Sequence, residues 1–197
     1  HTRVDPFYWL RERENPEVIA YLEAENAYQH AEMAHTGPLQ EALYQDMVGR
    51  IQETDASAPV PSGGYFYYFR TEAGKQYNIY CRKKGSLDAP EEVLLDLNAV
   101  AERGGFAFVK LGMYKISPDH SLLAYSLDTS GAEQFTLRFE DLSTGQDLPD
   151  QIENTYYAGE WANDNRTYFY TTLDHALRTY RLHCHTLGAD PASDPLL

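Results

Sequence analysis

The sequence has 197 residues, a length typical of about one domain, and its hydrophobic and charged fractions of 43% and 23% are ordinary for a globular protein. The formal net charge is −14 and the longest basic run is Arg82-Lys83-Lys84, which argues against nucleic-acid binding. There is no stretch of about 18 apolar residues, so no membrane span is predicted. The negative charge has two interpretations, attraction of cationic ligands and solubility alone.

An aromatic cluster opens the chain, because residues 5–10 read Asp-Pro-Phe-Tyr-Trp-Leu. A helix is predicted after it, since Asn15 is a favoured N-cap, Pro16 a favoured first helical residue, and Glu17 a carboxylate near the positive end of the helix dipole. The apolar residues of this helix trace one stripe at helical spacing. They are Val18, Ile19, Tyr21, Leu22 and Tyr28.

A second helix is predicted from Pro38 to about Arg50, because apolar residues recur there at four-residue spacing. Prolines and glycines then concentrate in residues 54–64, which indicates the joint between a helical arm and a β region. The first strands after the joint are predicted at Tyr65–Arg70, Gln76–Arg82 and Glu92–Asp96. A short helical turn over residues 98–103 is expected to end at Gly104-Gly105.

The clearest strand pattern follows the turn at Pro118-Asp119-His120. Residues 122–127 are largely apolar on both faces, so this strand should be covered on both sides. A second strand is predicted at 134–140, Ser143-Thr144-Gly145 turns the chain, and a short last strand is expected at 146–148.

The same plan returns with a turn at 161–166 and strands at 167–172 and 179–184. The offset of about 45 residues is typical of four-stranded propeller blades. The sequence therefore predicts a mainly β protein: a two-helix arm over residues 1–58 and a partial β-propeller over residues 59–197. Its blades are expected at about 59–110, 111–154 and 155–197. Since propellers close with about four to eight blades, we expect the native chain to be longer, the alternative being pairing with another chain.

Catalytic chemistry is not evident in the residues themselves. The sequence contains no Gly-x-Ser-x-Gly motif, and Ser130 and Ser143 belong to predicted hairpin turns. Histidines and aspartates are scattered over turns and strands, and a triad is defined by a geometry that sequence does not give. No catalytic residue, cofactor or metal ligand is therefore predicted. Cys81 and Cys184, in separate repeats, are expected to be free thiols, which favours a reducing, cytoplasmic location.

Several short segments, taken in order, resemble the prolyl oligopeptidase family of serine peptidases. They are residues 5–10, 64–68, 94–98, 117–119 with 123–126 and 130–131, and 161–164 with 169–171. Residues 77–83 and Leu94-Leu95-Asp96-Leu97-Asn98 are more similar to the oligopeptidase B (protease II) branch than to the proline-specific one. The resemblance covers essentially the whole sequence.

This resemblance implies a seven-bladed propeller that caps an α/β-hydrolase domain and admits only short peptides. It implies an arm that wraps onto that domain, and cleavage after Arg or Lys by a triad outside this sequence. The partners implied are basic peptides and the protein's own hydrolase domain. Proline-specific relatives use an aromatic residue about five positions before the blade-three tryptophan to line the peptide pocket. Counting back from Trp161 gives Tyr156, with Tyr157 beside it, and packing within the strand is the alternative role for both. A proline-specific peptidase and a non-catalytic propeller scaffold remain the alternative functions.

Overall fold

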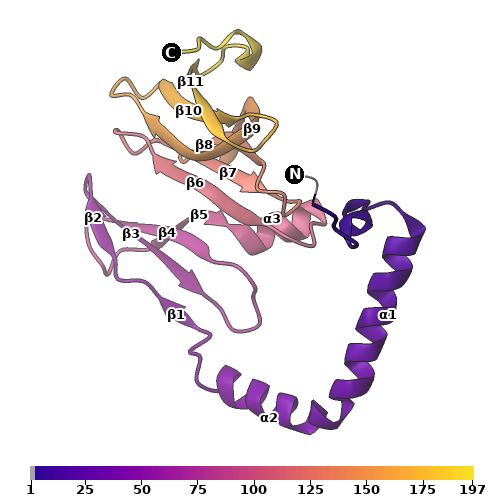
Figure 1. Cartoon of the computed structure of the whole chain (residues 1–197). Helices are drawn as coiled ribbons and strands as arrows, with labels where there is room; N and C mark the ends of the chain where they lie inside the picture. Colours follow the sequence, from indigo (N-terminus) through magenta and orange to yellow (C-terminus); the bar gives the residue numbers. More distant parts are fainter. Residues whose placement is uncertain (1–2) are drawn as a thin grey trace. The chain divides into compact units, whose positions relative to one another are not determined.

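The computed structural model describes residues 3–197 and divides into two compact units on either side of the Gln52–Glu53 bond. The first unit consists of helices, which diverge from a short connecting turn (Figure 1). Its elements are η1 (Tyr8–Arg11), α1 (Pro16–Met33), η2 (Ala34–Thr36) and α2 (Gly37–Val48).

The two helices form where the sequence predicts them. The Asn15 side chain accepts a hydrogen bond from the backbone N–H of Glu17 at 2.9 Å, and Pro16 is the first helical residue. Among residues 3–52, only Val18 is buried. Phe7, Leu22 and Tyr28 are exposed as expected, while Trp9 is half-buried with its ring 5.8 Å from that of Tyr21.

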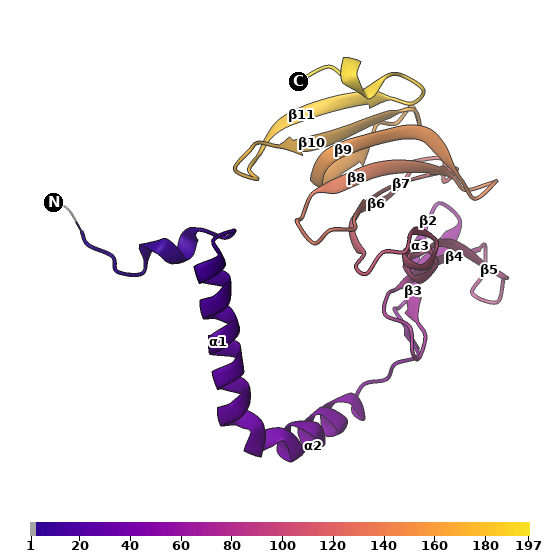
Figure 2. The same cartoon turned by 90° about the vertical axis from the view of Figure 1, so that its right-hand side faces the viewer.

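The second unit contains two antiparallel sheets. In the first, the strand order is β1-β3-β4-β5, with β2 paired to β3. Its strands are β1 (Asp55–Ala56), β2 (Val60–Ser62), β3 (Tyr65–Thr71), β4 (Ile79–Lys84) and β5 (Glu91–Asp96). The second sheet runs in sequence order from β6 to β11 and curls strongly (Figure 2). Its strands are β6 (Lys110–Ile116), β7 (Leu122–Asp128), β8 (Phe135–Asp141), β9 (Gln146–Trp161), β10 (Thr167–Leu173) and β11 (Thr179–Thr186).

Helix α3 (Leu97–Gly104) joins the two sheets, and the turn η3 (Pro191–Ser193) follows β11. The carboxylate of Asp96 caps α3 by accepting the backbone N–H groups of Asn98 and Ala99, and Gly105 ends it in the left-handed conformation that a C-cap glycine allows. The predicted mainly β fold with a two-helix arm is confirmed.

Two strand predictions need correction. The expected short strand at 146–148 is the start of β9, which runs for 16 residues to Trp161, so the predicted turn begins one residue later. Strand β6 was not predicted, because Gly112 interrupts its apolar pattern. A Cβ at that glycine would stand 2.6 Å from both the Phe135 ring and the Ser126 hydroxyl, so the close approach of β6 to its neighbours requires glycine.

The core of the second unit lies on both faces of β7. On one face Leu123, Tyr125 and Leu127 pack with residues of β5 and α3. On the other, Ala124 packs with β8, β9 and β10 in a cluster that includes Phe139, Trp161 and Tyr168. The prediction that this strand is covered on both sides is therefore confirmed. Cys81 and Cys184 are both free thiols.

Candidate functional site

The middle of β9 is the most irregular part of the large sheet, because the strand changes partners there. Its first half pairs with β8 and its second half with β10, and Thr155 pairs with both Phe135 and Thr172. Between its pairs at Ile152 and Thr155, β9 advances by three residues while β8 advances by two. Between its pairs at Thr155 and Gly159, β9 advances by four residues while β10 advances by two. Bulges of this kind bend a strand and redirect its side chains.

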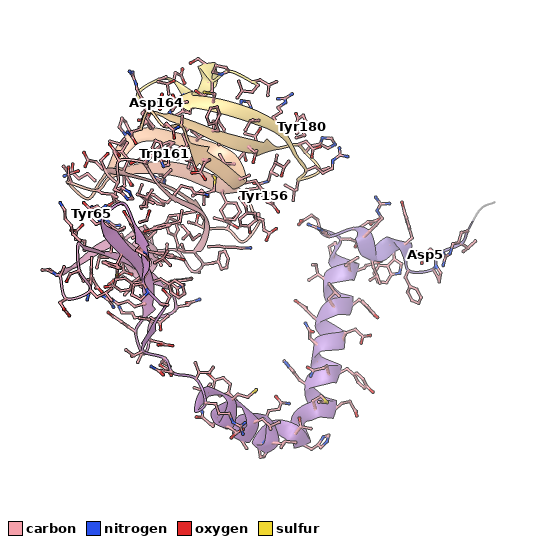
Figure 3. The ribbon with its side chains drawn as sticks, turned by 90° about the vertical axis from the view of Figure 1, so that its left-hand side faces the viewer. Asp5, Tyr65, Tyr156, Trp161, Asp164 and Tyr180 are labelled. Carbon is pink, nitrogen blue, oxygen red and sulfur yellow. The ribbon has the colours of Figure 1, made fainter. Side chains whose placement is uncertain are left out.

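Tyr156 and Tyr157 occupy this bulge, at the opposite end of the second half of β9 from Trp161 (Figure 3). In a regular strand, neighbouring side chains point to opposite faces. Here both rings contact Phe135, with centroids 6.4 Å and 4.7 Å from it, and they meet each other edge-to-face at 4.5 Å. Tyr156 is half-buried and Tyr157 is exposed. The bulge thus presents two adjacent aromatic rings that both pack on the buried Phe135 ring.

A surface ion pair borders the two tyrosines. Lys110 Nζ lies 2.7 Å from Glu133 Oε1, and the Tyr157 hydroxyl donates to the same oxygen at 3.3 Å. The Lys110 ammonium also lies 5.3 Å from the centre of the Tyr157 ring. Hydrogen bonding between the pair raises the pKa of Lys110 and lowers that of Glu133. Exposed pairs exchange partners at little cost, so both charges are available to a ligand that contacts the rings.

The two tyrosines and the ion pair do not form a catalytic centre, but they provide a surface against which an extended peptide could lie. Tyrosine rings provide rigid contact area with small loss of side-chain entropy, and the Tyr156 hydroxyl makes no hydrogen bond to any of residues 3–197. The arrangement can therefore bind an extended peptide through ring contacts, with a carboxylate or an ammonium beside them.

Comparison with known proteins identifies the chain. The family model described as "Prolyl oligopeptidase, N-terminal beta-propeller domain" matches residues 1–197. The chain belongs to the prolyl oligopeptidase family. The predicted resemblance and the predicted propeller fold are thereby confirmed.

Individual relatives agree. The chain is 41% identical to Dipeptidyl aminopeptidase BI from Pseudoxanthomonas mexicana and 41% identical to Protease 2 from Moraxella lacunata; each comparison covers 99% of this chain and 29% of the relative. Among solved structures, Oligopeptidase B from Leishmania major superposes with a TM-score of 0.87 at 36% identity, over 98% of this chain and 28% of that one. The chain thus spans less than a third of the length of these relatives.

The serines and aspartates that could be taken for catalytic residues in the sequence form turns instead. The hydroxyls of Ser130 and Ser143 donate to Asp128 and Asp141, the carboxylates two positions before them, at 2.8 Å and 2.6 Å. Asp164 likewise accepts from the backbone N–H groups of Arg166 and Thr167. The expected structural role of these residues agrees with the geometry.

One histidine does lie between carboxylates, and sequence reasoning missed its partners. His185 Nε2 and Nδ1 each lie 2.9 Å from a carboxylate oxygen, of Asp150 and Asp194 respectively. All three side chains are buried, and Tyr170 and the Gly188 N–H also donate to these carboxylates. With both ring nitrogens engaged by carboxylates, the group ties the segment after β11 to the sheet. No sequence motif could have indicated a contact between residues so far apart.

Among residues 3–197, no three His, Cys, Asp or Glu side chains converge as a metal site would require. None of the described helices combines the length and the apolar character of a membrane-spanning segment.

Proposed function

We propose that this chain is the arm and propeller part of an oligopeptidase that hydrolyses short peptides after Arg or Lys. The observation that carries the proposal is the match over the whole chain to the propeller model, together with 36% identity to an oligopeptidase B structure at a TM-score of 0.87. In this proposal, catalysis belongs to an α/β-hydrolase domain that these residues do not contain, and the enzyme is a cytoplasmic serine peptidase.

Within this proposal the propeller controls access of peptides to the catalytic domain. The arm corresponds to residues 1–58, and the blades to about 59–110, 111–154 and 155–197. Tyr156 and Tyr157 contact the peptide substrate. Their position on a bulge and the free hydroxyl of Tyr156 support this role. The exposed Glu133 beside Tyr157 adds a carboxylate that suits a basic peptide.

The acidic charge supports the same substrate class. A net charge of −14 attracts cationic peptides and raises their rate of arrival. Salt weakens this attraction, because it screens charges beyond about 10 Å at 0.1 M. We therefore expect kcat/KM for an Arg-containing peptide to fall as ionic strength rises, with kcat nearly constant.

A second candidate is removal of dipeptides from peptide N-termini. Dipeptidyl aminopeptidase BI is as similar to this chain as Protease 2 is, at 41% identity. Both activities need an activated nucleophile, a base and an oxyanion hole held together, and residues 3–197 provide no such set. The two candidates differ in whether a free N-terminal ammonium two residues before the cleaved bond is required.

The test compares three chromogenic amides: an N-blocked Arg amide, an N-blocked Pro amide, and an unblocked dipeptidyl amide. We expect the protein extended by its catalytic domain to prefer the blocked Arg amide, and residues 1–197 alone to hydrolyse none. Preference for the unblocked dipeptide would support the second candidate, and preference for Pro would support the proline-specific branch. Turnover by highly purified residues 1–197 would overturn the assignment of catalysis to another domain.

The role of the tyrosines is tested in the same protein. The substrate is the blocked Arg amide, extended by several residues on its N-terminal side. We expect Tyr156→Ala to lower kcat/KM for this substrate by about tenfold. Tyr180→Ala is the control, since Tyr180 is an exposed tyrosine on β11, which β10 separates from β9 (Figure 3). Equal, small effects of both substitutions would show that Tyr156 packs within the strand only.

A further inference from the structure

One face of β8 carries charged side chains without partners. Phe135, Leu137 and Phe139 point into the core and are completely buried, so the alternate residues Arg138 and Glu140 share the opposite face. This face lies beside α3, and two cavities of about 380 Å³ and 400 Å³ adjoin there. Both are lined by Arg103 of α3, Tyr125 of β7 and Asp147 of β9.

The two cavities have opposite charge character. The first is completed by Arg138 together with the apolar side chains of Phe106 and Leu127. The second is completed by Glu140 and by residues of β5. Asp147 lies at the junction, where its carboxylate accepts the Tyr125 hydroxyl at 2.7 Å. The first cavity is therefore lined by two arginines, an apolar wall and one carboxylate residue, and the second is lined by one arginine and three carboxylate residues, Asp96, Glu140 and Asp147.

Arg138 and Glu140 are half-buried, yet neither side chain makes a hydrogen bond or an ion pair with any of residues 3–197. Two other arginines removed from water are paired: the buried Arg82 lies 2.7 Å from Glu92, and the half-buried Arg70 lies 3.0 Å from Glu91. Removing a charge from water without a partner is costly, which distinguishes these two side chains from ordinary surface charges. Neither side chain forms an ion pair within the described residues, and the two do not pair with one another.

The charges around Glu140 are consistent with this reading. Burial, together with the nearby carboxylates of Asp147 and Asp141, raises the pKa of Glu140 to about 7, although Arg103 opposes the rise. Near neutral pH the side chain is therefore partly protonated. A cation placed beside it would favour the charged form and release a proton.

We propose that this double cavity binds a short zwitterionic peptide of about two residues. Its carboxylate lies against Arg103 and Arg138, its C-terminal side chain against Phe106 and Leu127, and its ammonium near Glu140 and Asp147. The spacing fits, because residues two apart on one strand face are separated by about 6.6 Å and an extended dipeptide spans about 7 Å. A guanidinium pair suits a carboxylate through parallel hydrogen bonds. The proposal does not rest on the proposed peptidase activity.

The first test uses the unmodified protein and calorimetric titration with Ala-Leu, N-acetyl-Ala-Leu and Ala-Leu-amide. We expect saturable binding of Ala-Leu, and binding weaker by about tenfold or more when either end is blocked. We also expect proton release at pH 7, seen as a binding heat that depends on the buffer's ionisation enthalpy. Absence of saturable binding would overturn the proposal, and so would equal binding of acetate or inorganic phosphate, which would indicate an anion site only.

The second test assigns each charged end to its residue. We expect Arg138→Leu to abolish the preference for Ala-Leu over Ala-Leu-amide, and Glu140→Gln to abolish the preference over N-acetyl-Ala-Leu together with the proton release. Arg181→Leu is the matched control, since Arg181 is an exposed strand arginine on β11. A variant that loses all three ligands equally, or none, would contradict the assignment. If Arg138→Leu does not fold, Arg138→Gln and the blocked peptides decide the same question.

Discussion

The two units of this chain differ in what forms their secondary structure. Helix α1 begins at a sequence-local signal, the Asn15 cap followed by Pro16, while its apolar residues Leu22 and Tyr28 are 50% and 65% exposed. Strand β8 has no such cap, yet its apolar side chains Phe135, Leu137 and Phe139 are completely buried, the last two among residues of β7, β9 and β10. The arm's helices therefore depend on local hydrogen bonds, and the sheet depends on burial between distant segments.

The largest effect that this contrast predicts is at Phe139. Its ring lies 5.6 Å from Trp161, 5.4 Å from Tyr168 and 5.7 Å from His185, all in the core of the large sheet. We expect Phe139→Ala to lower the free energy of unfolding by about 3–5 kcal/mol, because the cavity left behind cannot collapse. Urea unfolding followed by tryptophan fluorescence measures it, with Phe139→Leu as the milder control. A loss below about 1 kcal/mol would contradict the core assignment.

Asp128 should give the next largest effect, with a defined pH dependence. Its side chain is buried and accepts the N–H groups of Ser130, Gly131 and Glu133 and the Ser130 hydroxyl. Burial alone would raise the pKa of Asp128, but these hydrogen bonds outweigh burial and lower it. We expect Asp128→Asn to cost about 1–3 kcal/mol at pH 7, because an amide cannot accept all these bonds.

The pH dependence follows from the direction of the shift. A depressed pKa contributes stability above the unfolded value of about 3.9, and that contribution is lost as pH falls through the lower folded value. The difference between Asp128→Asn and the unmodified protein should therefore shrink below about pH 4. Urea midpoints from pH 3 to pH 7 measure it, with Asp88→Asn as the control at an exposed loop position. A constant difference over this range would show that the Asp128 charge is unimportant.

Much of this architecture was accessible from sequence because its signals are local. Caps, prolines and turn residues marked α1, α2 and the hairpins, and the two-sided apolar pattern of residues 122–127 predicted a covered strand. The bulge in β9 was not accessible, because it arises from the mismatch between the registers of β8 and β10. Tyr156 and Tyr157 were predicted from a family resemblance and counting, and their contact with Phe135 and Lys110 depends on that bulge.

Long-range polar groups were also beyond sequence reasoning. Asp150 and Asp194 meet His185 from segments 35 and 9 residues away, and no spacing rule links them. The same holds for the cavity between α3 and β8, where Arg103 and Arg138 come together only through the packing of a helix on a sheet. Such sites are set by tertiary structure, and composition alone does not indicate them.

A smaller, local effect is expected at the start of α1. Asn15 Oδ1 accepts the Glu17 N–H at 2.9 Å, so Asn15→Ala should weaken α1 by about 1 kcal/mol, while Asn15→Ser should preserve most of the cap. Hydrogen exchange should show faster exchange in the first turns of α1, and the urea midpoint of the β region should not change. A shift of that midpoint would mean that the arm and the sheets unfold as one unit.

The smallest effect is expected at Leu22, and it separates the arm from the sheets most sharply. Half of this side chain is exposed, and truncating exposed residues typically changes stability by less than about 0.5 kcal/mol. In residues 1–197 we therefore expect Leu22→Ala to leave thermal unfolding almost unchanged.

In a longer protein with the proposed catalytic domain, an arm packed against that domain would bury Leu22, and the same substitution should cost about 2–5 kcal/mol. Glu23→Ala, at a neighbouring exposed position, controls for helix propensity in both proteins. Equal, small losses from Leu22→Ala in the two proteins would show that this stripe of α1 stays uncovered.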